Sequence, residues 1–198
     1  MDHLNQTLFL LINAGPQPDA AVVSIAKVLA NALIWIVPVG LVVGWLRGSL
    51  SARQRLITAT VAVGIGLALN QAIGLAWYHP RPFAMGLGRT LIAHAADSSF
   101  PSDHATVIWA VAFALIVHPR MRVAGAALAL IGALVAWARI YTGVHCPLDM
   151  VGAATVAMGS VWLALLLETP WIARMMPGLI ALHKTLFAPL IRRAWVRE

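Results

Sequence analysis

Long apolar runs separated by short polar junctions are the feature that most restricts what this chain can fold into. Four such runs cover residues 20–43, 56–77, 123–137 and 148–167. A helix needs about 20 mostly apolar residues to cross the hydrocarbon core of a bilayer. The chain is 61% hydrophobic and 11% charged, whereas soluble domains average about 45–50% apolar and about 25% charged residues. The sequence therefore predicts a helical membrane protein.

A fifth apolar run, residues 105–117, is too short to span unless its helix begins at Ser102. The expected fold is thus all-α, a single membrane-embedded domain (residues 1–198) with five to six transmembrane helices. The expected spans are residues 20–45, 56–77, 102–118, 122–140 and 148–168. The tail, residues 178–195, is expected to be a basic amphipathic helix on the membrane surface; the alternative is a sixth, imperfect span.

The net charge of +7 does not indicate nucleic-acid binding, because the cations fall mainly between apolar runs. With five spans, one side of the membrane carries Arg47, Arg53, Arg55, Arg120, Arg122, Arg174, Lys184, Arg192, Arg193 and Arg197. Cytoplasmic loops carry the excess of Lys and Arg, so this side is expected to be cytoplasmic. The N-terminus would then face the periplasm or cell exterior. The single cysteine, Cys146, excludes an intrachain disulfide.

Three polar islands lie on the predicted outer side: residues 78–82, 100–104 and 139–149. Arg81 and Arg139 are isolated cations there, and arginine is suited to bidentate recognition of phosphate. Ser102 stands where a helix should begin, and the free N–H groups of a first helical turn bind anions. The three islands are predicted to meet and bind a phosphate. Alternatively, Ser102 only caps its helix and the arginines only anchor the interface.

The islands also contain groups that titrate. His145 and Asp149 are four residues apart, and Pro147 between them suits the start of a helix. In a near-helical segment the two side chains share a face, so Asp149 could orient the imidazole, as in other nucleophile–carboxylate pairs. His104 falls in the first turn of the third span. A metal site using the same histidines with Asp103 and Asp149 is a rival, which the nearby arginines disfavour.

The islands resemble the three-part signature of the type 2 phosphatidic acid phosphatase superfamily: Arg81-Pro82, then Pro101-Ser102-Asp103-His104, then Arg139-x5-His145-x3-Asp149. Residues 79–83, 94–104 and 138–150 are most similar to bacterial undecaprenyl-pyrophosphate phosphatases of the bacitracin-resistance type. The similarity covers most of the chain, from the first helix to the fifth span.

The resemblance implies a role for each matching residue. His145 would be the nucleophile that forms a phospho-histidine, Asp149 would orient it, and His104 would protonate the leaving group. Arg81, Ser102 and Arg139 would hold the phosphoryl oxygens. Such roles agree with the residue chemistry, because phosphoryl transfer depends mostly on positioning and charge stabilisation. Neither a metal nor another cofactor is expected.

The sequence departs from the family pattern at three positions. Gly74 stands where the family has a lysine, Asp103 replaces a glycine, and Ala138 replaces a serine. Lys27, about one-third of the way along the first span, is a candidate to replace the missing lysine as a phosphate-binding cation; alternatively it reaches back to the interface. Asp103 is expected to pair with a nearby cation.

The expected function is hydrolysis of the terminal phosphate of undecaprenyl pyrophosphate, at the outer face of the bacterial cytoplasmic membrane. The products would be undecaprenyl phosphate, the carrier lipid of cell-wall synthesis, and inorganic phosphate, and overexpression would confer bacitracin resistance. One rival is a phosphatase or phosphotransferase for another lipid phosphate, such as phosphatidylglycerol phosphate. Another is a small membrane transporter, which few mid-span polar residues support. The polyprenyl lipid and the membrane are the expected partners.

Overall fold

The computed structural model describes residues 2–198, which form helices and loops without a strand. Its helices are α1 (Asp2–Ile12), α2 (Ala20–Asn31), α3 (Ile36–Arg47), α4 (Leu50–Ala76), α5 (Asp103–Ile116), α6 (Arg122–Tyr141), α7 (Pro147–Leu167) and α8 (Ala173–Arg192). Two 3₁₀ turns, η1 (Leu33–Trp35) and η2 (Pro82–Met85), and a π-helical turn, η3 (Glu168–Ile172), complete the set. The predicted all-α class is confirmed.

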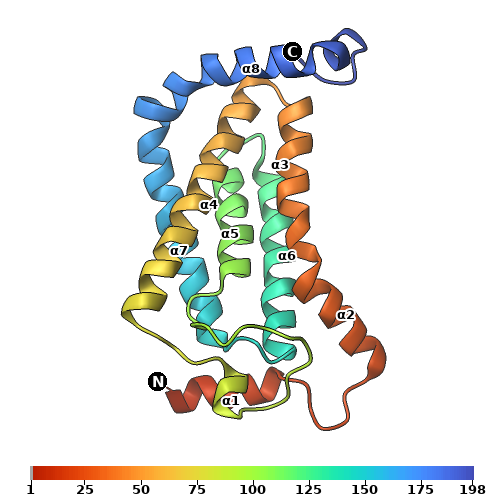
Figure 1. Cartoon of the computed structure of the whole chain (residues 1–198), viewed down its shortest axis with the longest axis vertical. Helices are drawn as coiled ribbons and strands as arrows, with labels where there is room; N and C mark the ends of the chain where they lie inside the picture. The colour runs from red at the N-terminus through yellow and green to blue at the C-terminus, as the bar shows by residue number, and fades with distance from the viewer. Residues whose placement is uncertain (1) are drawn as a thin grey trace.

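Helix α5 is the centre of the bundle and packs against α4, α6 and α7 (Figure 1). Small side chains fill much of this core; Ala59, Ala62, Ala110, Ala157 and Ala164 are all buried there. Small residues let helix backbones approach closely, which is how helices associate where lipid removes the hydrophobic driving force. The bundle is thus held by close packing around a short central helix.

Four helical segments are long and apolar enough to cross a membrane: Ala20–Arg47, Leu50–Ala76, Arg122–Tyr141 and Pro147–Arg192. The first joins α2 and α3 through η1. Helix α5 is the shorter apolar helix, and it begins at Asp103 with Ser102 as its N-cap. The start predicted at Ser102 is therefore within one residue of the structure, and it leaves the second polar island at the end of the bundle.

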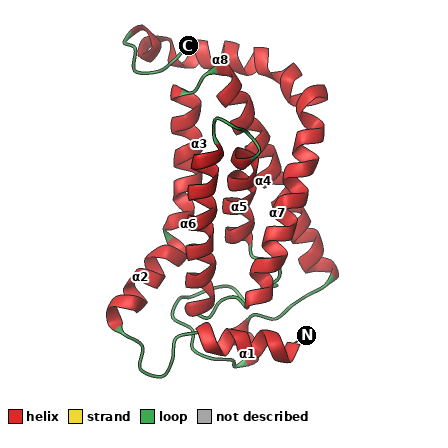
Figure 2. Ribbon diagram, turned by 180° about the vertical axis from the view of Figure 1, so that it is seen from behind, coloured by secondary structure: helices red, strands yellow, loops and turns green. Residues whose placement is uncertain are grey.

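Two helices lie across opposite ends of the bundle. Figures 1 and 2 both show α1 crossing the end where α4 finishes and α5 starts, and α8 crossing the other end. The buried His183 fixes α8 there: it accepts a hydrogen bond from Trp45 Nε1 at 3.1 Å and lies 3.0 Å from an Arg53 amino group. Helix α8 therefore lies across the end of the bundle and does not run alongside α4.

The contact between α5 and α6 predicts a strong effect of one added methyl group. A Cβ at Gly125 would lie 2.6 Å from the Ile116 nitrogen and 2.7 Å from the Ala112 oxygen. Backbone atoms cannot yield, so Gly125→Ala should destabilise the protein by about 1–3 kcal/mol. The loss of stability should appear as a lower midpoint temperature of thermal unfolding in detergent. The reactivity of the buried Cys146 thiol reports the unfolding.

Gly159→Ala in α7 is the matched control, because no atom lies within 4 Å of the added Cβ. Alanine favours a helix over glycine by about 1 kcal/mol, so this variant should be as stable as the parent or more so. Equal midpoints for the two variants would contradict the close α5–α6 contact.

Candidate active site

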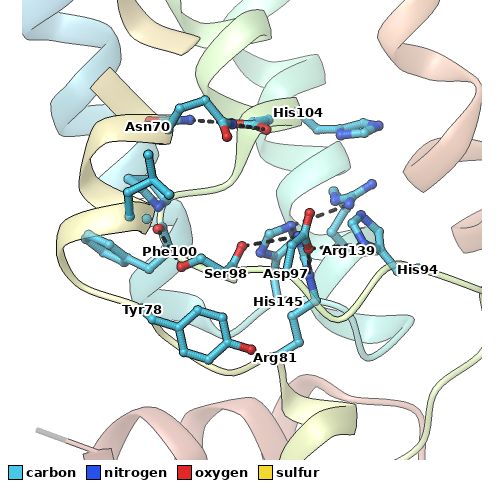
Figure 3. A pocket seen from close by; sticks show the side chains of 15 residues that line it. Asn70, Tyr78, Arg81, His94, Asp97, Ser98, Phe100, His104, Arg139 and His145 are labelled. Carbon is cyan, nitrogen blue, oxygen red and sulfur yellow. Dashed lines mark hydrogen bonds and ion pairs between the residues drawn. The ribbon is translucent and has the colours of Figure 1, made fainter. Parts of the chain in front are cut away.

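The three polar islands meet at the α1 end of the bundle, as predicted. They line a cavity of about 370 Å³ together with the last turns of α4 (Figure 3). Of the predicted site residues, Arg81, His104, Arg139 and His145 line it. The remaining lining residues are Asn70, Gln71, Gly74, Leu75, Tyr78, His94, Asp97, Ser98, Phe100, Pro101 and Asp103.

Asp149 holds His145 in place at the start of α7. Pro147 is the first residue of that helix, which makes Cys146 its N-cap and puts Asp149 in the first turn. The Asp149 Oδ2 atom accepts the Cys146 backbone N–H at 2.7 Å and lies 3.2 Å from His145 Nδ1. The buried Ser99 hydroxyl donates to the same oxygen. The predicted pairing of His145 with Asp149 is therefore present, and it is part of a helix cap.

The other nitrogen of the His145 ring faces two arginines. Nε2 lies 3.2 Å from an Arg81 amino group and 3.4 Å from an Arg139 amino group. Both guanidinium groups can only donate, so Nε2 is the acceptor and Nδ1 carries the proton given to Asp149. Burial, and then the charges of Arg139 and Arg81, hold the pKa of His145 well below its usual value. The ring is a neutral imidazole whose lone pair points into the cavity.

Arg81 is fixed by contacts with two other segments of the chain. Its Nη1 donates to the Val144 oxygen at 2.9 Å, and its Nε donates to the Asp97 carboxylate at 2.7 Å. Burial raises the pKa of Asp97, but the hydrogen bond and charge of Arg81 outweigh it, so this pKa lies below its usual value. Asp97 is therefore ionised, and the Arg81 fork is ordered before any ligand binds.

Arg139 is buried near the end of α6 and donates to the Ala30 oxygen of α2 at 3.1 Å. Its Nε has no hydrogen-bond partner within residues 2–198. His94 also lines the cavity, 3.8 Å from Asp97. Burial, followed by the charge of Arg81, lowers the pKa of His94. The site thus combines two fixed guanidinium groups with neutral histidines, which makes it complementary to an anion.

His104 lies in the first turn of α5 and lines the same cavity, in the position expected of it. Its neighbour Asp103 does not have the expected partner. The Asp103 carboxylate accepts from Asn70 Nδ2 at 2.8 Å and from Gln71 Nε2 at 3.4 Å, and within the described chain it has no ion pair. The expected ion pair of Asp103 is therefore wrong for the described residues, because the end of α4 offers amides instead.

Three predicted residues are not in the cavity lining: Asp149, which lies behind His145, and Lys27 and Ser102. Lys27 is exposed on α2 and does not line the cavity, so the structure does not bring it to Arg81 and Arg139. Ser102 is the N-cap of α5, but its side chain makes no capping bond, and its buried Oγ lacks a partner in the part of the chain that the structure describes. The four residues that line the cavity, Arg81, His104, Arg139 and His145, are therefore better placed to contact a phosphoryl group than Lys27 and Ser102 are.

Sequence reasoning did not assign a role to Asp97, His94 or Ser99. Asp97 falls on the predicted outer side together with Asp103 and Asp149, close to the isolated cations Arg81 and Arg139, and that proximity of opposite charges was a usable signal. Ser99 has no such signal, because its role depends on where a loop lies. In the described chain, no group of three or more His, Cys, Asp or Glu side chains could hold a metal ion.

Comparison with known proteins agrees with this geometry. Residues 55–172 match the family model of the PAP2 superfamily. The chain is 36% identical over 198 residues to "Putative undecaprenyl-diphosphatase YbjG" of Escherichia coli, covering all of both chains. It is 34% identical over 155 residues to "Undecaprenyl-diphosphatase BcrC" of Bacillus subtilis, covering 78% of this chain and 79% of that one.

Among solved structures, LpxE of Aquifex aeolicus has the same fold, with a TM-score of 0.69 at 23% identity. The match covers 82% of this chain and 94% of that one. The fold and cavity define a multi-pass membrane protein with a site that combines histidines and buried arginines. The chain belongs to the PAP2 superfamily and is a membrane phosphatase of that superfamily.

The two arginines beside His145 predict an unusual protonation behaviour. At about pH 6 a free imidazole is more than half protonated. Because the pKa of His145 is lowered, its neutral form should persist at this pH and become charged only at lower pH. Nitrogen-15 NMR of histidine-labelled protein in micelles should show a neutral ring with the proton on Nδ1.

The His145→Gln variant assigns the signal, since only that resonance disappears from its spectrum. A His145 ring that is already charged at about pH 6, or one that carries its proton on Nε2, contradicts the arrangement in the cavity.

Proposed function

We propose that this protein hydrolyses the terminal phosphate of undecaprenyl pyrophosphate through a phospho-histidine on His145. One observation carries the proposal: the neutral His145 ring is bonded to Asp149 through Nδ1 and offers Nε2 to a cavity between Arg81 and Arg139. The substrate is chosen from the relatives named undecaprenyl-diphosphatase, one of which matches over its whole length. The products are undecaprenyl phosphate and inorganic phosphate.

In the first step, His145 Nε2 attacks the terminal phosphorus and the bond to the bridging oxygen breaks. His104, which is protonated beside the anionic substrate, acts as the general acid and gives its proton to that oxygen as undecaprenyl phosphate leaves. Arg81 and Arg139 exchange their contact with Nε2 for contacts with the phosphoryl oxygens, where paired donors stabilise the developing charge. The unpartnered Arg139 Nε supplies a further donor. Asp149 stabilises the positive charge that the ring acquires.

In the second step, a water molecule attacks the phospho-histidine. His104, now neutral, takes one proton from this water, and the new P–O bond forms as the P–N bond breaks. Inorganic phosphate leaves, and His145 returns to its neutral form with the proton still on Nδ1. One water is consumed in each cycle, and the proton that His104 takes from it replaces the one that left with undecaprenyl phosphate in the first step.

The position of the cavity supports a lipid substrate. It lies at the end of the apolar bundle, and its lining includes Leu75 of α4, whose side chain is 88% exposed on the outside of the helix. The phosphates can therefore occupy the polar end while the prenyl chain remains in the bilayer. We place this end on the periplasmic side of the bacterial inner membrane, because it carries few cations.

Trapping with labelled substrate tests the mechanism. Rapid denaturation of the protein during turnover should give a labelled protein whose label is lost in acid and stable in base, as expected for phospho-histidine. His145→Ala should abolish the label and lower phosphate release by about 10³-fold or more, because no other group replaces the nucleophile.

The buried thiol of Cys146 serves as the folding control, since it should stay unreactive in a folded His145→Ala variant. Turnover of that variant at the wild-type rate ends the nucleophile assignment. Failure of the wild-type protein to release phosphate in micelles, where transport is impossible, favours a transporter. Faster turnover of phosphatidylglycerol phosphate would change the substrate but not the mechanism.

Cysteine labelling tests the orientation. Gln17→Cys places an exposed thiol at the cavity end, and Ser51→Cys places one at the α8 end. A maleimide that cannot cross membranes should label Gln17→Cys but not Ser51→Cys in spheroplasts, because the cation-rich end faces the cytoplasm. Buried Cys146 keeps the background low. The reverse labelling pattern contradicts a periplasmic active site.

A further inference from the structure

We propose that Ser99 is a positioning residue for the nucleophile: its hydroxyl fixes the Asp149 carboxylate, and through it the His145 ring, from a separate part of the chain. The inference rests on the proposed function of His145. Ser99 lies outside the three-part signature, and no role follows for it from the sequence pattern.

The hydroxyl has two neighbours in the catalytic pair. Ser99 Oγ donates to Asp149 Oδ2 and lies 3.5 Å from His145 Nδ1. Ser99 and His145 are each 2% exposed and Asp149 is 3% exposed. In such surroundings a hydrogen bond to a charged oxygen is strong, and its loss is not replaced by bulk water. The serine therefore contributes directly to where the carboxylate rests.

The three donors to Asp149 Oδ2 are not equivalent. The Cys146 N–H and the His145 Nδ1 belong to the start of α7, the same segment that carries Asp149. These two contacts would move with that helix as one body. Ser99 belongs to the loop between α4 and α5, so its contact alone ties the carboxylate to another element. The angle of the His145 ring relative to the arginines depends on such a tie.

Ser99 is itself held firmly. Its N–H donates to the His79 oxygen at 2.7 Å, which connects it to the island that carries Arg81. The following Phe100 ring packs on Gly152 of α7 so closely that even an added Cβ would collide with it. Ser102 N–H then donates to the Asp149 backbone oxygen at 3.3 Å. The loop therefore sits on the first two turns of α7 with the Ser99 hydroxyl directed at Asp149.

A simpler role for Ser99 is to satisfy a buried polar group, with no influence on the reaction. The two roles differ in what they change. A residue that only stabilises the fold alters the amount of folded protein. A positioning residue lowers the rate of the chemical step in folded protein and leaves substrate binding unchanged, because among the described residues its hydroxyl bonds only to Asp149 and His145.

The test compares Ser99→Ala with Ser160→Ala in purified protein with undecaprenyl pyrophosphate. Ser160 is a matched control: it is also buried and lies on α7, and its hydroxyl donates to the Ala157 oxygen within the helix. Ser99→Ala should lower kcat by about 10- to 100-fold, the usual cost of losing such an orienting contact, with KM within about twofold of wild type. Ser160→Ala should retain the wild-type kcat.

A double-mutant cycle shows whether Ser99 acts through Asp149. In an Asp149→Ala background, Ser99→Ala should lower kcat by less than about twofold further, because interacting residues are not additive. The same loss in both backgrounds overturns the proposal, as does a wild-type kcat for Ser99→Ala. If Ser99→Ala does not fold, as judged by Cys146 reactivity, Ser99→Thr and Ser99→Val replace it. The threonine variant keeps a hydroxyl where the valine variant has a methyl group. Equal kcat values for these two variants also overturn the proposal.

The outcome is separable from that of the proposed function. Absence of phospho-histidine in the wild-type protein rejects the nucleophile itself. Normal trapping in the wild type and Ser160→Ala, together with an unaffected Ser99→Ala, rejects only the role of Ser99.

Discussion

The hydrogen bonds to one carboxylate oxygen, Asp149 Oδ2, organise the whole site. The oxygen accepts the Cys146 N–H and so satisfies a free donor at the start of α7, which is ordinary helix capping. The same oxygen accepts the His145 Nδ1 proton. Because the cap fixes the carboxylate beside His145 Nδ1, Nε2 is the ring nitrogen that remains free to act as a nucleophile. A local requirement of helix formation and the orientation of the candidate nucleophile are therefore met by a single atom.

The three islands are tied to one another mainly by backbone groups. Arg81 donates to the Val144 oxygen, which joins the first island to the third. The N–H of Ser99, the residue just before the second island, donates to the His79 oxygen of the first. These ties cross the end of a bundle packed tightly through alanine and glycine. The loops can thus hold side chains accurately although they contain no long regular element, and the short α5 leaves room for them at the membrane edge.

Features set by spacing along one helix could be predicted from the sequence. The spans follow from the length needed to cross a bilayer, and the His145–Asp149 pair follows from an i, i+4 spacing with proline at the helix start. Features that depend on which face of a helix points into the bundle, or on the path of a loop, could not be predicted from the sequence. Lys27 has a suitable depth in its span, but depth does not say which way α2 faces, and the side chain is exposed. Asp97 and Ser99 meet their partners only through the path of the loop before α5.

The charge of the site explains why a histidine suits it. Two buried or nearly buried guanidinium groups beside Nε2 disfavour a charged ring, so the imidazole stays neutral and keeps its lone pair. In the mechanism that we propose, the bound phosphates bring negative charge, and the arginines leave Nε2 and bind the phosphoryl oxygens. The P–N bond would then make the ring positive, and Asp149 and the phosphoryl oxygens would offset that charge. On this proposal, the arginines that hold the ring neutral in the free protein favour attack only when an anionic substrate is present.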